Sequence, residues 1–158
     1  MQKITTCLWF DNQSEEAVNF YTSVFKNSKI GTTARYDEAA SKAAGMPSGS
    51  VMTMTFELEG REFMTINGGP HFKFNESISL VINCENQEEV DYYWDKLTSG
   101  GGQESMCGWL KDKFGLSWQV VPTELGKLMS SKETGKAQRV MAALLQMKKL
   151  DINTLRNA

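Results

Sequence analysis

The feature that most constrains this chain is an internal repeat of strand and helix signals. In the first half, an apolar and β-branched segment at residues 3–10 precedes an amphipathic helical segment at residues 14–26. Three further segments have the composition or the alternation of strands, at residues 29–36, 51–58 and 61–67. The first half of the chain therefore predicts a strand, a helix and three more strands.

The second half repeats this order. A strand signal at residues 77–84 precedes a helical segment at residues 86–98, and strand signals return at residues 105–110 and 116–122. A repeat of this size restricts the fold more than any single motif does. We therefore predict an α+β fold in which two βαβββ modules form a cleft.

Local similarity between the two halves supports the repeat. Residues 12–16 (NQSEE) resemble residues 85–89 (ENQEE), after which Phe20-Tyr21 corresponds to Tyr93-Trp94. Glutamates at these places favour the positive ends of the two helices and are not expected to act as paired catalytic carboxylates.

The length of 158 residues fits a single domain, residues 1–158. Within it we predict a first module at residues 3–67, a second at residues 77–122 and a helical tail at residues 123–158. Residues 37–49 are small and rich in glycine, proline and serine, so they predict a loop inside the first module.

The tail has helical signals at residues 123–130 and 135–149. Asp151 can cap a last short turn at residues 152–157, as Asn12 or Ser14 can cap the first helix. We expect this tail to pack either on the domain or on a second subunit.

Charge and composition exclude several classes of protein. Seventeen basic and nineteen acidic residues give a net charge of −2, which argues against binding to nucleic acid or to an anionic membrane. No apolar run approaches 18 residues, so no transmembrane helix is expected, and the N-terminal residues lack the pattern of a signal peptide.

The cysteines are Cys7, Cys84 and Cys107, an odd number without a C-x-x-C pair. This arrangement predicts reduced thiols and a cytoplasmic location rather than a disulfide framework or a sulfur-rich zinc site. His71 is the single histidine, so a site with two or three histidines cannot form within one chain.

Several sequence blocks resemble the PhnB-like family, whose members often carry the label 3-demethylubiquinone-9 3-methyltransferase. The family belongs to the vicinal oxygen chelate superfamily, with glyoxalase I, bleomycin-resistance proteins and extradiol dioxygenases. The resembling blocks are Cys7–Asp11, Glu15–Ala17, Phe20-Tyr21, Asn67–Glu76, Glu88–Trp94, Cys107–Gly115, Ser117–Pro122 and Arg139–Leu150. The resemblance implies a homodimer and a cleft lined by curved sheets, and it implies no single activity.

The resemblance also locates the positions that hold metal in metal-using relatives. Counted from Phe20-Tyr21 and its counterpart in the second module, the first-strand positions fall on Thr6 and Ser79. The last-strand positions fall on Gln119 and near Phe63 or Thr65. These residue types are poor ligands for zinc, iron or nickel, so we predict no metal and no cofactor.

The period of two along a strand extends this assignment to whole faces. The predicted cleft-facing residues mix apolar side chains with neutral hydrogen-bonding ones. They are Thr6, Leu8, Phe10, Thr65, Asn67, Ser79, Val81, Asn83, Ser117, Gln119 and Val121. The predicted helix-facing residues are Met64, Ile66, Leu80, Ile82, Trp118 and Val120, all apolar. Such a cleft suits a small organic ligand that is uncharged or mildly polar and partly aromatic.

Candidate ligand-binding residues follow from these faces and from the loops beside them. They are Thr6, Phe10, Thr65, Asn67, His71, Ser79, Asn83, Trp109 and Gln119. His71 is either a proton donor at the mouth of the cleft or an ordering residue of the linker. Trp109 either lines the cleft or packs in the core, and Asn67 either binds ligand or forms a turn.

Two further segments contain residues that could be reactive but also have a structural interpretation. Cys107 is either a nucleophile or a buried or edge thiol, and the sequence around it offers no histidine or basic partner that would support a nucleophile. Lys111 and Lys113, on either side of Asp112, predict a solvated turn. The methyltransferase label lacks sequence support, because no glycine-rich turn precedes the helix at residue 14.

Three functions remain at this point. The leading hypothesis is a protein that binds or sequesters a small organic ligand. The second is an enzyme of the superfamily that uses His71 together with residues of a partner subunit. The third is a dimer that works through protein partners.

Overall fold

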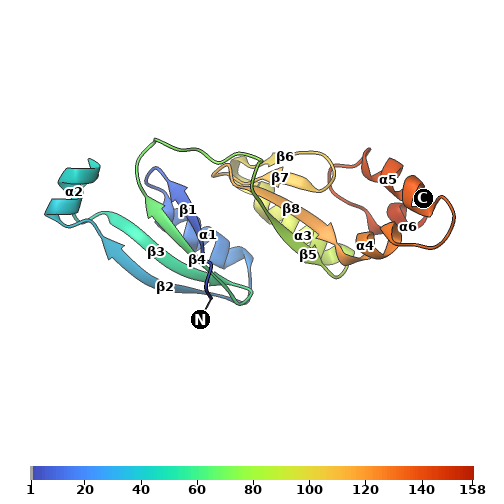
Figure 1. Cartoon of the computed structure of the whole chain (residues 1–158), viewed down its shortest axis with the longest axis horizontal. Coiled ribbons are helices and arrows are strands. Elements are labelled where there is room, and N and C mark those ends of the chain that lie inside the picture. The colour runs from blue at the N-terminus through green and yellow to red at the C-terminus, as the bar shows by residue number, and fades with distance from the viewer. Residues whose placement is uncertain (1) are drawn as a thin grey trace. The chain divides into compact units, whose positions relative to one another are not determined.

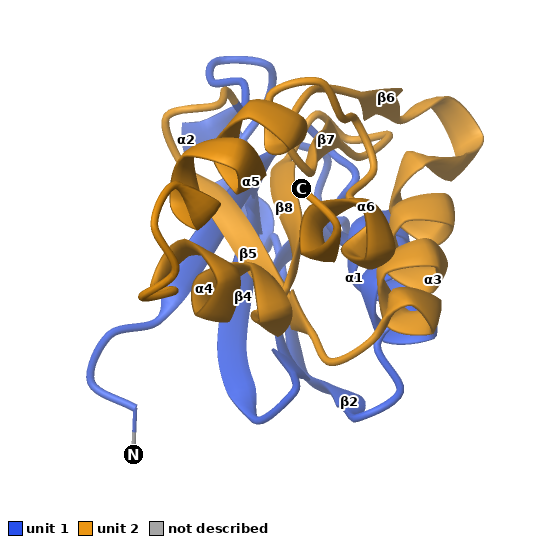
Figure 2. Ribbon diagram, turned by 90° about the vertical axis from the view of Figure 1, so that its right-hand side faces the viewer, with its two compact units in different colours: residues 1–74 blue, residues 75–158 orange. Residues whose placement is uncertain are grey.

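The computed structural model describes residues 2–158, which form two compact units. The first unit ends at Phe74 and the second begins at Asn75 (Figures 1 and 2). Each unit contains one four-stranded sheet and one long helix, in the order strand, helix and three strands. The predicted α+β class with two βαβββ repeats and a helical tail is therefore confirmed. No helix in residues 2–158 is long and apolar enough to cross a membrane.

The first sheet has the strand order β1-β4-β3-β2, with β1 parallel to β4. Its strands are β1 (Thr6–Phe10), β2 (Ser28–Arg35), β3 (Val51–Leu58) and β4 (Arg61–Asn67). Helix α1 (Ser14–Val24) covers one face of this sheet. Tyr21 of α1 stacks on Phe56 of β3, and Phe56 stacks on its cross-strand partner Phe63, which builds an aromatic core.

The predicted loop at residues 37–49 contains a short helix, α2 (Glu38–Ala44). The Asp37 side chain accepts a hydrogen bond from the Ala40 N–H, and Gly45 ends the helix in the left-handed conformation. No residue of α2 is buried. The loop prediction depended on the small residues and the glycine, proline and serine of this segment, and a helix without a buried face gives no apolar period to set against them.

The second sheet has the order β5-β8-β7-β6, with β5 parallel to β8. Its strands are β5 (Ser79–Cys84), β6 (Gln103–Glu104), β7 (Trp109–Lys111) and β8 (Ser117–Pro122). Helix α3 (Gln87–Thr98) and a short 3₁₀ turn (Ser99–Gly101) lie between β5 and β6. The predicted strand at 105–110 is corrected to two shorter strands, because a turn separates β6 from β7.

The tail forms three helices, α4 (Thr123–Met129), α5 (Lys136–Leu144) and α6 (Ile152–Arg156). Asp151 caps α6 as predicted, accepting a hydrogen bond from the Thr154 N–H at 2.6 Å. Helix α5 ends five residues before its predicted limit. The tail packs on the second unit, because Gln87 of α3 donates to the Leu150 carbonyl and accepts from the Ile152 N–H.

The apolar cluster of the tail predicts the effect of one truncation. Leu150 is fully buried with Val140 and Leu155. Replacing Leu150 by alanine should destabilise the docked tail by about 2–5 kcal/mol, because it leaves a cavity in this cluster. Hydrogen exchange of the Cys107 and Gly108 amides reports the effect, since these amides donate to Met147 and Lys148 of the tail.

Leu145→Ala is the matched control, because the Leu145 side chain is 55% exposed. It should leave the exchange of both amides unchanged. Equal acceleration of exchange in the two variants would contradict the role assigned to Leu150.

Cys84 provides a second prediction, on thiol reactivity. Its side chain is fully buried at the end of β5. Burial raises the pKa of the Cys84 thiol to about 12, and the nearby Glu89 carboxylate adds to the effect. The double variant Cys7→Ser/Cys107→Ser should therefore release no equivalent from Ellman's reagent at pH 8 while folded, and one equivalent in guanidinium chloride. A full equivalent released before unfolding would show that Cys84 is accessible.

Candidate functional site

In the second unit, the open face of the sheet, opposite α3, carries the residues predicted for it. Ile82, Cys84, Trp118 and Val120 are buried on the helix side, whereas Val81 is 50% exposed. The open face carries Ser79, Asn83, Trp109 and Gln119, which alternate with the buried set. Gln119 Nε2 donates to Ser79 Oγ at 2.9 Å, so these two candidates form one polar pair.

In the first unit, the predicted facing is wrong. Leu8, Phe10 and Thr65 are 5%, 3% and 0% exposed, and they lie on the face that α1 covers. Thr6 shares this face by alternation, although its own side chain is exposed at the end of the strand. Met64 and Ile66, predicted to face the helix, instead lie on the opposite face and are partly exposed.

The error has a physical cause in the length of one connection. Three residues separate β1 from α1, whereas two separate β5 from α3. The prediction placed Thr6 before Phe20-Tyr21 at the same spacing that separates Ser79 from Tyr93-Trp94, which assumes strand-to-helix connections of equal length. A shift of one residue along a strand moves every side chain to the other face, so the open face of the first sheet carries Cys7 and Trp9 instead of Leu8 and Phe10.

Asn67 holds the first unit together. Its Oδ1 accepts a hydrogen bond from the Ser14 N–H at 3.0 Å, and its Nδ2 donates to the Val51 carbonyl at 3.0 Å. Gln13 is the cap residue of α1 and makes no side-chain cap bond, so the predicted capping by Asn12 or Ser14 is wrong. The free N–H at the start of α1 is therefore bonded by a side chain 53 positions away in the sequence. A local sequence pattern cannot show such a partner.

The remaining loop candidate, His71, follows β4 in an exposed segment. It lies next to Phe72, whose ring contacts Trp9 edge-on at 4.9 Å between centroids. His71 lines neither of the two pockets described below.

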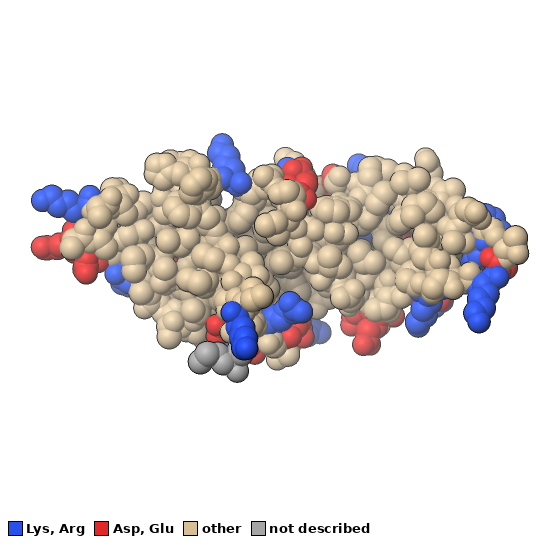
Figure 3. Space-filling model, viewed as in Figure 1, with Lys and Arg blue, Asp and Glu red and all other residues tan. Residues whose placement is uncertain are grey.

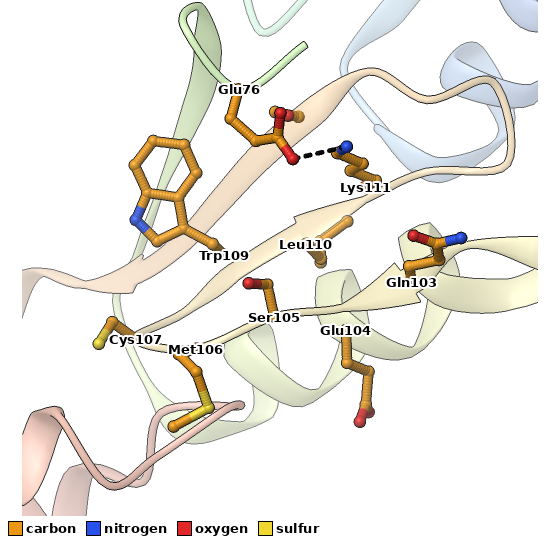
Figure 4. A pocket seen from close by; sticks show the side chains of 10 residues that line it. Glu76, Gln103, Glu104, Ser105, Met106, Cys107, Trp109, Leu110 and Lys111 are labelled. Atoms are coloured by element: carbon orange, nitrogen blue, oxygen red, sulfur yellow. Dashed lines mark ion pairs between the residues drawn. The ribbon is translucent and has the colours of Figure 1, made fainter. Parts of the chain in front are cut away.

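The open face of the second sheet carries a pocket of about 450 Å³. Figure 4 shows its side chains, with Trp109 and Lys111 projecting from β7 and Glu76 reaching toward Lys111. The lining residues are Glu76, Gln103, Glu104, Ser105, Met106, Cys107, Trp109, Leu110, Lys111 and Ser117. Of the predicted site residues, this pocket contains Trp109, and Gln119 is its cross-strand neighbour.

The polar groups of this pocket are an ion pair and a serine. Lys111 Nζ lies 2.6 Å from Glu76 Oε1. The hydrogen bond from Lys111 lowers the pKa of the Glu76 carboxyl, which keeps it ionised in the pair. Ser117 is fully buried, and its hydroxyl has no hydrogen-bond partner in the part of the chain that the structure describes.

The turn between β6 and β7 forms one wall of the pocket. Cys107 and Gly108 have φ angles of 60° and 83°, in the left-handed region. A Cβ on Gly108 would lie 2.9 Å from the Val120 carbonyl oxygen and 3.2 Å from the Leu150 side chain, so only glycine fits there. The Cys107 and Gly108 amides donate to the Met147 and Lys148 carbonyls, which means that the tail supports this wall.

Sequence reasoning missed Glu76 and Lys111 as site residues. Lys111 was predicted in a solvated turn, but it is the last residue of β7, and Asp112 beside it is 3% exposed. The alternation Trp109, Leu110, Lys111 places the tryptophan and the lysine on one face, so this signal was present. Glu76 gave no comparable signal, because it lies in a segment without regular structure.

A second pocket, of about 490 Å³, lies in the first unit beside the start of α1. It is lined by Asp11, Asn12, Glu15, Arg35, Met46, Pro47, Ser50, Val51 and Asn67. Asn67 is almost fully buried at the edge of this pocket. Its side-chain amide is already bonded to the Ser14 N–H and the Val51 carbonyl.

The residues at the positions expected for metal do not suit a metal ion. On the open face of the second sheet, Ser79 offers a hydroxyl and Gln119 offers an amide that donates to Ser79. The positions counted in the first unit, Thr6 and Phe63, share the face that α1 covers, so they do not lie on an open face. Within residues 2–158, no group of three His, Cys, Asp or Glu side chains could hold a metal ion. The disagreement with metal-using relatives lies in the types of donor present.

The surface charges are mixed in sign. On the face shown in Figure 3, scattered lysine, arginine, aspartate and glutamate side chains lie among uncharged residues, and the basic ones form no continuous area. This distribution agrees with the net charge of −2 and offers no surface typical of nucleic-acid binding on that face.

Comparisons with known proteins agree with the fold and the sequence blocks. The sequence model of the 3-demethylubiquinone-9 3-methyltransferase family matches residues 2–121. A PhnB protein from Bacillus cereus that carries the same methyltransferase description is 40% identical, with a TM-score of 0.68. The match covers 77% of this chain and 100% of that chain. The comparison with curated proteins gives no match.

More distant structures share the fold alone. A Pseudomonas aeruginosa protein is 17% identical, with a TM-score of 0.61, and the match covers 77% of this chain and 98% of that one. The fosfomycin resistance protein FosX from Listeria monocytogenes is 14% identical, with a TM-score of 0.55 and coverage of 82% and 98%. The chain therefore belongs to the 3-demethylubiquinone-9 3-methyltransferase, or PhnB-like, family.

Proposed function

We propose that this protein binds a small, partly aromatic organic ligand in the pocket on the open face of the second sheet. The observation that carries the proposal is the Ser117 hydroxyl. Of the three buried hydroxyls without a partner in residues 2–158, those of Ser14, Thr65 and Ser117, it is the one whose residue lines a described pocket. A buried hydroxyl without a partner costs free energy, and a bound molecule with a polar group would satisfy it. Trp109 lines the same pocket and supplies an aromatic wall.

The proposal includes a metal-free and cofactor-free site in a homodimer. The donor types of Ser79 and Gln119 support the first part, and the family resemblance supports the second. A cytoplasmic location is proposed with it, because all three cysteines are free.

The family name implies methyl transfer, and we do not extend that activity to this chain. The connections before α1 and α3, residues 11–13 and 85–86, contain no glycine. A nucleotide-like methyl donor is usually held by a glycine-rich turn at such a place. No contact favours the enzymatic alternative that uses His71, since this side chain is exposed outside both pockets.

Removal of the aromatic wall tests the proposal. Indole, 2-naphthol, coumarin and 2-naphthamide form a suitable panel, and we expect at least one to raise the melting temperature of the wild-type protein. In Trp109→Ala the shift should disappear, because the ligand loses its largest apolar contact.

Tyr92→Ala is the control for loss of an aromatic ring in the same unit. Tyr92 lies on α3, outside the pocket lining. This variant should keep the thermal shift. The proposal fails if no compound stabilises the wild type more than it stabilises Trp109→Ala.

A further inference from the structure

Glu76 enters the pocket from a segment that belongs to neither sheet. Residues 68–78 connect β4 to β5 without a helix or strand, and most of them are exposed. Glu76 is the residue of this segment that lines the pocket, and its side chain remains 62% exposed. An ion pair with such exposure contributes little to stability, so a competing anion can readily replace the Glu76 carboxylate at Lys111.

The partner of Glu76 lies beside the unsatisfied serine. Lys111 on β7 and Ser117 on β8 are cross-strand partners in the antiparallel register. Lys111 pairs with Glu76 Oε1, while the Ser117 hydroxyl is left without a partner in residues 2–158. A carboxylate presents two oxygens, so one carboxylate of a ligand can accept hydrogen bonds from both groups.

We propose that Glu76 is a tethered competitor in an anion subsite, and that the ligand is an aromatic carboxylic acid. Its carboxylate displaces Glu76 from Lys111 and accepts a hydrogen bond from Ser117. Its ring lies against Trp109, which projects from the same face of β7 as Lys111 (Figure 4). This inference rests on the proposed function, because it names the ligand class of the same pocket.

A tethered competitor lowers apparent affinity by the fraction of protein in which it occupies the subsite. Removing the charge of Glu76 should therefore strengthen binding of a carboxylate and leave a neutral isostere unaffected. Removing the charge of Lys111 should abolish the preference for the carboxylate. These opposite effects follow from one subsite and are not expected of a pocket that selects on shape alone.

The probes are 2-naphthoate and 2-naphthamide, measured by isothermal titration calorimetry on the full chain. We expect Glu76→Gln to bind 2-naphthoate about three- to tenfold more tightly than the wild type, with 2-naphthamide unchanged. Lys111→Met should bind the two probes equally. Ser117→Ala should weaken 2-naphthoate about tenfold, by the loss of one hydrogen bond to a charged group.

Glu88→Gln is the control for net charge, because Glu88 is exposed on α3 and outside the pocket lining. It should match the wild type for both probes. Equal affinities of the wild type and Glu76→Gln for 2-naphthoate would overturn the inference, as would an equal gain for both probes. If the amide then still bound in a Trp109-dependent manner, the proposed function would stand alone. Failure of both probes to bind any variant would overturn the inference and count against the pocket itself.

Discussion

Replacing Asp112 by alanine is expected to destabilise the second unit by about 3–5 kcal/mol, although the residue lies between two lysines. Its carboxylate is 3% exposed. Oδ1 accepts hydrogen bonds from the Phe114 N–H at 2.9 Å and the Leu116 N–H at 3.1 Å. Oδ2 accepts from Trp118 Nε1 at 2.8 Å.

The physical reason is the set of donors that alanine would leave behind. The indole N–H of Trp118 is buried in the core, and a buried donor without a partner costs about 1–3 kcal/mol. The two backbone donors belong to the turn that connects β7 to β8, so their loss also loosens the strand that carries Trp109 and Lys111.

Chemical denaturation of Asp112→Ala measures this effect, with Lys113→Ala as the control. Lys113 is exposed and its ammonium lies 5.1 Å from the centroid of the Phe114 ring, so its removal should change the free energy of unfolding by no more than about 1 kcal/mol. A similarly small loss for Asp112→Ala would mean that the segment is the solvated turn predicted from the sequence.

Asn67→Ala is expected to destabilise the first unit by about 2–4 kcal/mol. The substitution leaves the Ser14 N–H and the Val51 carbonyl without their partner, and both lie in buried surroundings. It therefore detaches the start of α1 from the sheet. Denaturation curves with Asn12→Ala as the matched control test this effect, because Asn12 is exposed beside the same pocket.

The two variants also separate structure from ligand binding. Because Asn67 is assigned to the framework of the first unit, Asn67→Ala should lose stability whether or not a ligand is present. Unchanged stability with weakened binding of every compound that the protein takes up would instead assign Asn67 to a ligand site.

The repeat in the sequence predicted the fold because each half has its own strand and helix periods. Those periods depend on burial within one unit, as in β3, where Met54, Phe56 and Leu58 are all buried. The exposed helix α2 had no such period and was missed. The facing of β1 was missed because it depends on a single residue of connection length, between Phe10 and Ser14.

The facing of the second sheet was predicted, because regular alternation decides it. Ser79, Asn83 and Gln119 were placed on the open face by the period of two along β5 and β8. Glu76 reaches Lys111 from an irregular segment 35 positions away, and Asn67 reaches Ser14 across 53 positions. Contacts of this kind arise from tertiary packing, which no local pattern encodes.

The placement of the ligand site in the second unit is tested most directly by ¹H–¹⁵N NMR. The indole N–H signals of the four tryptophans are followed during titration with 2-naphthamide. Assignment uses Trp109→Phe and Trp9→Phe. Trp109 lines the pocket of the second unit, whereas Trp9 lies in the first unit with its Nε1 donating to the Gly69 carbonyl. We predict that the Trp109 signal shifts in a saturable manner while the Trp9 signal stays in place. A saturable shift of Trp9 with an unmoved Trp109 would contradict the placement of the ligand site.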